Sequence, residues 1–129
     1  MLNAVLVALG GALGALMRYW MVSVVNLRFG TGFPWGTLSV NVLGSFLIGV
    51  CVVLIQQRFQ SDMLVRSLLM VGLLGGFTTF SAFSLDTVQL LHSGLIIKAV
   101  LNIAMNVSIC LTATIAGLLC TDWLTGLYS

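Results

Sequence analysis

The feature that most constrains this chain is the spacing of its charged residues, which leaves long stretches without any charge. Three such stretches, 29–57, 67–85 and 99–121, are separated by single charges or small groups of them. Each is about as long as the roughly 20 apolar residues that an α-helix needs to cross about 30 Å of hydrocarbon. Only 6% of the residues are charged and 60% are hydrophobic, whereas a soluble domain carries about 25% charged residues. The pattern excludes a soluble fold and predicts a membrane protein.

The uncharged stretches predict an all-α membrane protein with one four-helix domain over residues 1–129. We expect the transmembrane helices at residues 3–25, 35–57, 67–91 and 97–122. Turn-forming and charged residues separate them at Asn26 to Pro34, at Arg58 to Arg66 and at His92 to Gly94. The first segment has no basic residue before Arg18, so we interpret it as a retained helix and not as a secretory signal.

The basic residues are divided almost equally between the two sides of the predicted bundle. Arg58 and Arg66 fall on the side of both termini, and the other side holds Arg18, Arg28 and Lys98. Because Lys and Arg normally accumulate on the cytoplasmic side, this balance favours insertion in both orientations and an antiparallel pair of copies. A fixed orientation decided by one or two charges is the alternative.

The first helix carries small residues at a spacing typical of close helix contacts. Gly10 and Gly14 form a GxxxG spacing, which Gly11 and Ala15 repeat one position later. Small residues at this spacing let two backbones approach closely in lipid. The spacing fits contact between two copies and packing within one chain equally well.

The segment Gly75 to Ser84, GGFTTFSAFS, is unusually polar for the middle of a transmembrane helix. Glycine and the β-branched Thr78 and Thr79 weaken a helix. Irregular backbone survives at membrane depth only where it is buried in protein or lines a polar cavity. We therefore predict that the third helix is broken near Gly75 to Thr79 and that an ion or solute site lies there. The released carbonyl oxygens would suit a hard cation.

Side chains suited to an anion follow in the same segment and in the second helix. Phe80 and Phe83 share a helix face, and the edge of an aromatic ring is electropositive. The hydroxyls of Ser81 and Ser84 are offset by one residue, and Asn41 could donate two hydrogen bonds. The alternatives are ordinary packing for the rings and an interhelical hydrogen bond for Asn41.

Two further polar residues within the spans have a structural and a functional interpretation. Thr114 continues the polar stripe Asn102, Asn106 and Cys110, although a lone threonine usually bonds the carbonyl four positions earlier. Arg18 either extends its charge to the interface or attracts anions at a vestibule.

Three segments together resemble the Fluc (CrcB) family of bacterial fluoride channels over essentially the whole chain: Gly75 to Ser84, Gly10 to Tyr19 in the first helix and Gly36 to Ser45 in the second. The resemblance implies an antiparallel, dual-topology homodimer in the bacterial inner membrane. Its two pores would let cytoplasmic fluoride leak out passively and so confer fluoride resistance.

The resemblance also implies roles for individual residues. Phe80 and Phe83 would be the rings that line each pore. Hydrogen-bonding groups along the path would come from Asn41, Ser81, Ser84 and Thr114, and Arg18 would lie toward an aqueous vestibule. A structural Na⁺ at the dimer axis would be held by the backbone carbonyls of Gly75 and Thr78 from both subunits.

Two other classes of protein compete with a channel. A small multidrug-type, proton-coupled exporter needs a titratable carboxylate in the membrane, yet the first helix has none and Asp86 lies near a predicted helix end. A structural or assembly protein would use the break only to let helices cross closely.

We do not expect an enzyme, because the single histidine, His92, has no neighbouring carboxylate cluster. The chain has three cysteines and no CxxC spacing. We therefore interpret them as small apolar residues of the helices: Cys51, Cys110 and Cys120.

Overall fold

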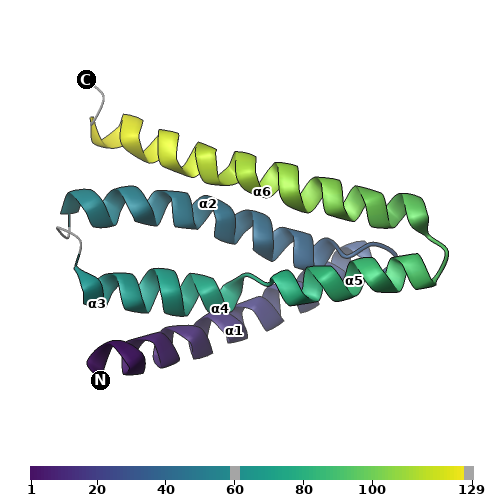
Figure 1. Ribbon diagram of the computed structural model, residues 1–129, viewed down its shortest axis with the longest axis horizontal. Helices are drawn as coiled ribbons and strands as arrows, with labels where there is room; N and C mark the ends of the chain where they lie inside the picture. Colours follow the sequence, from purple (N-terminus) through teal and green to yellow (C-terminus); the bar gives the residue numbers. More distant parts are fainter. Residues whose placement is uncertain (59–61, 127–129) are drawn as a thin grey trace.

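The computed structural model describes residues 1–58 and 62–126, and within them every regular element is helical. The helices lie side by side along one long axis, with both termini at the same end (Figure 1). The elements are α1 (Leu2–Phe29), α2 (Trp35–Arg58), α3 (Met63–Arg66), the π-helix η1 (Ser67–Leu74), α4 (Gly75–Phe77), α5 (Phe80–His92) and α6 (Ile96–Thr125). Residues Met63–His92 form one long span, and the four spans are each long and apolar enough to cross a membrane. The predicted all-helical class with four spanning helices is confirmed.

The helices extend further than the charge pattern predicted. Asn26 to Phe29 were expected in a turn, but α1 continues through them to Phe29. It ends where Gly30 adopts a φ of 76° and its N–H donates to the Asn26 carbonyl at 2.9 Å. A helix keeps its internal hydrogen bonds beyond the hydrocarbon, so its end is set by such a C-terminal glycine. Arg28 in the last turn also interacts favourably with the helix dipole.

The third span begins earlier than predicted for a similar reason. The Asp62 side chain accepts a hydrogen bond from the Leu64 N–H at 2.8 Å and caps α3 at Met63. An N-terminal aspartate satisfies one of the backbone donors that a helix start leaves open. At the other end of this span, Gly94 has a φ of 74° in the short connection to α6, as the predicted turn requires.

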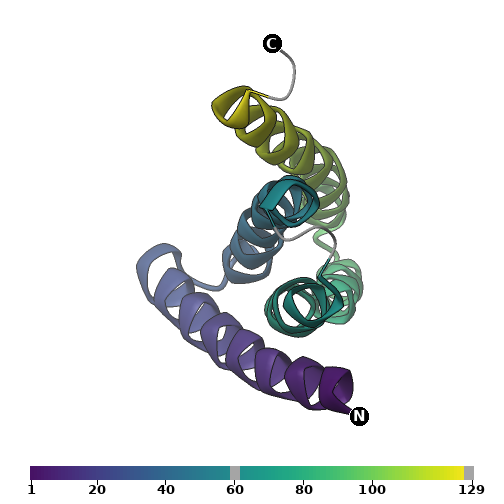
Figure 2. The same cartoon turned by 90° about the vertical axis from the view of Figure 1, so that its left-hand side faces the viewer.

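Seen end on, α1 and α6 lie on opposite sides, with α2 and the third span between them (Figure 2). α1 packs mainly against η1 and also against α2 and α4, while α2 packs mainly against α6. The α2–α6 crossing has almost no room for side chains, because a Cβ at Gly49 would lie 2.9 Å from the Leu118 nitrogen.

The GxxxG residues of α1 pack within the chain. Gly10 and Gly14 are buried, and a Cβ at Gly14 would press on the Leu73 carbonyl oxygen and lie 2.8 Å from the Phe77 nitrogen. Gly76 faces the same helix, since its Cβ would lie 2.6 Å from the Gly11 oxygen. Of the two interpretations that the sequence left open, the structure supports intrachain packing.

Candidate functional site

The third span has two residues of extended backbone between α4 and α5, which we call the Thr78–Thr79 segment. Thr78 has φ −82° and ψ 160°, and Thr79 has φ −153° and ψ 116°. Gly75 and Gly76, by contrast, are helical. The backbone therefore departs from the helix at the two β-branched residues. Of the two neighbouring glycines, Gly76 allows close approach to α1, whereas Gly75 faces no atom of α1 within 4 Å.

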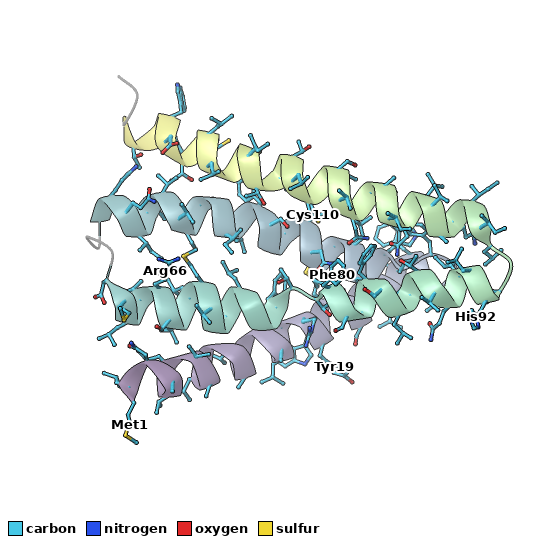
Figure 3. All side chains as sticks on the ribbon, viewed as in Figure 1. Met1, Tyr19, Arg66, Phe80, His92 and Cys110 are labelled. Carbon is cyan, nitrogen blue, oxygen red and sulfur yellow. The ribbon has the colours of Figure 1, made fainter. Side chains whose placement is uncertain are left out.

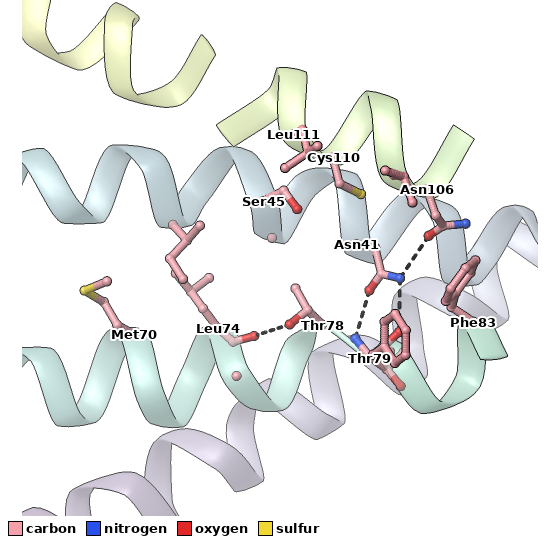
Figure 4. A pocket seen from close by; sticks show the side chains of 15 residues that line it. Asn41, Ser45, Met70, Leu74, Thr78, Thr79, Phe83, Asn106, Cys110 and Leu111 are labelled. Atoms are coloured by element: carbon pink, nitrogen blue, oxygen red, sulfur yellow. Dashed lines mark hydrogen bonds between the residues drawn. The ribbon is translucent and has the colours of Figure 1, made fainter. Parts of the chain in front are cut away.

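A side chain from α2 replaces the backbone hydrogen bonds that the Thr78–Thr79 segment does not make. In a continuous helix the Thr79 N–H would donate to the Gly75 carbonyl. It donates instead to Asn41 Oδ1 at 2.8 Å, and Asn41 Nδ2 donates back to the Thr79 carbonyl at 3.1 Å. The Asn41 carboxamide thus takes the place of a peptide group beside Thr79 (Figure 4). This pairing removes much of the free-energy cost of irregular backbone in a membrane.

Further hydrogen bonds hold both sides of the segment. The Thr79 hydroxyl accepts from the Ala82 N–H at 3.1 Å and caps α5. The Thr78 hydroxyl donates to the Leu74 carbonyl at 3.0 Å. Arg18, which is half-buried in α1, donates from Nη1 to the Thr78 carbonyl at 3.3 Å. The positive charge of Arg18 therefore points at the Thr78–Thr79 segment.

A cavity of about 450 Å³ opens beside this segment, between the third span, α2 and α6. Phe80 and Cys110, two of its lining residues, lie near the middle of the long axis, with Met1 and His92 at opposite ends (Figure 3). The residues that line the cavity are mostly apolar, with a polar edge near Thr79: Asn41, Gly44, Ser45, Ile48, Met70, Leu74, Gly75, Thr78, Thr79, Phe80, Phe83, Asn106, Val107, Cys110 and Leu111.

Both predicted aromatic residues lie in this cavity and contact each other. The ring centroids of Phe80 and Phe83 are 5.3 Å apart, with an interplanar angle of 55°. Phe83 is 8% exposed, whereas Phe80 is 76% exposed. Tilted rings direct their electropositive edges and negative faces to different sides, so the pair can present an edge to an anion in the cavity.

The structure brings together five of the predicted site residues. Asn41, Phe80, Phe83, Gly75 and Thr78 all line the cavity. Their association depends on α2 and the third span lying side by side, which the sequence pattern alone did not fix.

Four other predicted residues do not line this cavity. The Ser84 hydroxyl donates to the Phe80 carbonyl at 2.9 Å, and Ser81 and Thr79 share a hydrogen bond of 3.2 Å between their hydroxyls. The Thr114 hydroxyl points at two backbone oxygens, 3.0 Å from the Ser45 carbonyl and 3.1 Å from that of Cys110. Arg18, the fourth, contacts the Thr78 carbonyl as described above. Their roles in an ion path remain predictions.

Sequence reasoning missed Thr79, Ser45 and Asn106 as lining residues. Asn106 lies in the polar stripe of the fourth span, which was visible in the sequence. Its place in the cavity lining could not be predicted, because the sequence does not show that this stripe faces α2. In the structure Asn106 Oδ1 accepts a hydrogen bond from Asn41 Nδ2 at 3.1 Å. Both protons of the Asn41 amide are therefore used within the chain, one on Thr79 and one on Asn106.

The lining side chains are electrically neutral. No acidic side chain is among the described residues around the cavity. Asp86 lies elsewhere, and its carboxylate accepts a hydrogen bond of 2.6 Å from the Thr37 hydroxyl. The cavity is lined by neutral amide, hydroxyl and aromatic groups.

A hard cation would have to use neutral oxygens here. In residues 1–58 and 62–126, no group of three His, Cys, Asp or Glu side chains could hold a metal ion. Gly75 and Thr78 border the cavity, and the usual donor to the Gly75 carbonyl is bonded to Asn41. Carbonyl oxygens fit a hard cation in type, but two from one chain are too few to surround it. A complete site would need oxygens from a second chain.

Comparison with known proteins gives a consistent result over almost the full length. A family model described as CrcB-like protein, Camphor Resistance (CrcB), matches residues 5–118. A protein of Rhizobium etli (strain CIAT 652) is 49% identical over 118 residues, which cover 92% of this chain and 94% of the relative. A protein of Allorhizobium ampelinum is 46% identical over 125 residues, covering 96% and 99%, and one of Hahella chejuensis is 48% identical over 119 residues, covering 92% and 94%. All three relatives are named fluoride-specific ion channel FluC.

Proposed function

Because this chain belongs to the CrcB-like protein family, we propose that it is a multi-pass membrane protein that acts as a fluoride-selective ion channel and not as an enzyme. It gives passive efflux of cytoplasmic fluoride, and thereby fluoride resistance, across the bacterial inner membrane. The observation that carries the proposal is the neutral cavity at the Thr78–Thr79 segment, which is lined by Asn41, Phe80 and Phe83 together.

The chemistry of the cavity supports fluoride as the permeating ion. Fluoride is small and strongly hydrated, so a pore must replace its water with closely placed donors. The lining combines the Asn41 and Asn106 amides and the aromatic rings with hydroxyl groups, those of Ser45, Thr78 and Thr79. Because these donors are neutral, they can release the ion again, as conduction requires.

The entry of fluoride changes one hydrogen bond of Asn41. Both Asn41 Nδ2 protons have acceptors, the Thr79 carbonyl and Asn106 Oδ1, each at 3.1 Å. An anion that takes an Asn41 proton displaces one of these acceptors. The Asn106 oxygen is the replaceable one, since loss of the Thr79 bond would leave a backbone carbonyl without its partner.

The complete channel is an antiparallel homodimer with two pores. The broken third helix of each copy lies at its centre, and the cavity of one chain is closed by the other. The exposure of Phe80, 76% in the single chain, supports this arrangement, because a pore must be closed on all sides. The nearly equal division of basic residues between the two sides supports dual topology.

The same arrangement would complete a cation site at the dimer axis. The backbone carbonyls of Gly75 and Thr78 from both copies would hold a structural Na⁺, which supplies fixed positive charge close to the pores. The Arg18 guanidinium, 3.3 Å from the Thr78 carbonyl, adds positive potential to the same region. Ser81, Ser84 and Thr114 would extend the path with hydroxyl groups beyond the cavity.

A proton-coupled exporter is not favoured. Such a protein needs a carboxylate that binds protons and substrate in turn. Asp86 is held by Thr37 and lies outside the cavity lining.

Fluoride efflux from liposomes tests the proposal. The purified protein is reconstituted, and external fluoride is followed with an electrode, with chloride as the control anion. We expect a passive fluoride flux that needs no proton gradient. The double variant Phe80→Ile, Phe83→Ile should lose this flux, and Phe29→Ile, an exposed ring at the end of α1, should keep it. An absence of flux in the wild type, or wild-type flux in the double variant, would contradict the proposal.

A further inference from the structure

A line of hydrogen-bonded side chains leads from the cavity into the interior of the protein. It consists of Asn41, Asn106, Asn102 and Thr87, which we call the amide relay. Asn102 is 0% exposed, Asn106 6% and Thr87 7%. The relay joins α2, α6 and α5, and its inner members are closed off from the cavity. Every buried side-chain nitrogen and oxygen of the described residues has a hydrogen-bond partner.

The inner end of the relay has a fixed direction. The Thr87 hydroxyl donates its single proton to the Phe83 carbonyl at 2.8 Å. Toward Asn102 this hydroxyl can only accept, and Asn102 Nδ2 donates to it at 2.9 Å. Asn102 must therefore turn its amide oxygen toward Asn106, whose Nδ2 donates to it at 2.9 Å.

The outer end is fixed independently, and in the same direction. The Thr79 N–H is a donor, so Asn41 must face it with Oδ1 and present Nδ2 to its other neighbours. Asn106 then has to accept from Asn41 with Oδ1, as it does at 3.1 Å. Rotating the Asn106 amide by half a turn would oppose two NH₂ groups on one side and two oxygens on the other. One orientation of Asn106 satisfies both ends.

We propose that Asn102 is a positioning residue for the ion path: held by Thr87, it fixes the amide of Asn106, and through it the Asn41 donors that meet the permeating anion. This inference rests on the proposed function of the cavity. Without the Asn102 side chain, Asn106 Nδ2 keeps only its 3.1 Å bond to the Asn102 carbonyl, so the Asn106 amide is held by one inner hydrogen bond where it had two. The acceptor that Asn106 offers to Asn41 is then less firmly held, and the pairing of Asn41 with Thr79 loosens.

The flux test uses two substitutions that remove hydrogen-bonding groups, of which Thr87→Val is nearly isosteric. Asn102→Leu removes the relay at its centre, and Thr87→Val removes only the hydroxyl that sets its direction. The matched control is Thr112→Val, which removes a hydroxyl donating to the carbonyl four residues earlier, Ser108, on an exposed part of α6. Thr87→Ser is the conservative variant that should restore wild-type behaviour.

Fluoride flux per active vesicle separates positioning from stability. We expect Asn102→Leu and Thr87→Val to lower the rate per active vesicle by about fivefold to tenfold, the effect of losing roughly one hydrogen bond. The fraction of active vesicles should stay that of the wild type. A residue needed only for stability would lower this fraction and leave the rate per vesicle unchanged, and that result would overturn the proposal. An unchanged rate in both variants would do the same.

A measurement independent of transport completes the test. Hydrogen exchange at the Thr79 amide reports the Asn41 Oδ1 bond, and we expect faster exchange in Asn102→Leu and Thr87→Val than in Thr112→Val. Wild-type protection in both relay variants would refute the relay. If the wild-type protein moves no fluoride, the proposed function fails, while this exchange experiment still decides whether Asn102 positions Asn41.

Discussion

Replacing Gly14 by alanine should destabilise the chain by an amount that the structure allows us to estimate. An alanine Cβ would press on the Leu73 carbonyl oxygen and lie 2.8 Å from the Phe77 nitrogen, closer than the 3.0 Å that real Cβ atoms keep. Both obstacles are backbone atoms of the third span, so no side-chain rotation can relieve the contact. The change must separate α1 from η1 and α4.

The magnitude follows from two opposing terms. Overpacking of this kind costs about 1–3 kcal/mol, and alanine regains about 0.5–1 kcal/mol over glycine within a helix. Gly11→Ala is the matched control in the same helix, because its Cβ would find its nearest neighbour, the Gly72 oxygen, at 3.9 Å. The helix-propensity term is common to both variants. Gly14→Ala should therefore be less stable than Gly11→Ala by about 1–3 kcal/mol, the overpacking cost alone.

Reversible unfolding in mixed micelles, followed by circular dichroism, measures both free energies. Each variant is measured at two protein concentrations, because contact within one chain gives a concentration-independent loss. Equal stability of Gly14→Ala and Gly11→Ala would refute the reasoning. A loss that grows on dilution would show instead that the α1 glycines lie between two copies.

Two further predictions concern the Thr78–Thr79 segment. Asn41→Leu leaves the Thr79 N–H and carbonyl without their partners, so we expect a loss of about 1–3 kcal/mol for each buried group, measured by unfolding in micelles; wild-type stability would contradict the role of Asn41. Thr79→Val removes the cap of α5 and should cost about 0.5–2 kcal/mol, with faster hydrogen exchange at the Ala82 amide, whereas Thr79→Ser should retain the protection.

Local sequence patterns predicted the features that depend on neighbours along one helix. The four spans follow from the absence of charge, and the Thr114 hydrogen bond to the Cys110 carbonyl, four residues earlier, follows the general tendency of threonine in membrane helices. The helices were predicted too short, because charge marks the edge of the hydrocarbon, whereas Gly30 marks the end of α1 and Asp62 the start of the third span.

Features that depend on the rotation of one helix against another could not be predicted. The bond between Asn41 and Thr79 spans 38 positions, and that between Asn41 and Asn106 spans 65. Nothing in the local sequence tells whether an asparagine faces a backbone, an ion or lipid. The roles of Gly75 and Gly76 were ambiguous for the same reason, since a glycine that weakens a helix and one that admits a neighbouring helix look alike.

The carboxamide of Asn41 also has a consequence for the order in which the protein is made. Synthesis runs from the N-terminus, so α2 is complete before the ribosome reaches Thr79. Asn41, which pairs with the N–H and the carbonyl of Thr79, is therefore already present when that segment enters the membrane. Asn106 follows only with α6. Nascent chains that end before α6 should already hold Thr79 against Asn41, and the last helix then adds the second acceptor of the Asn41 amide.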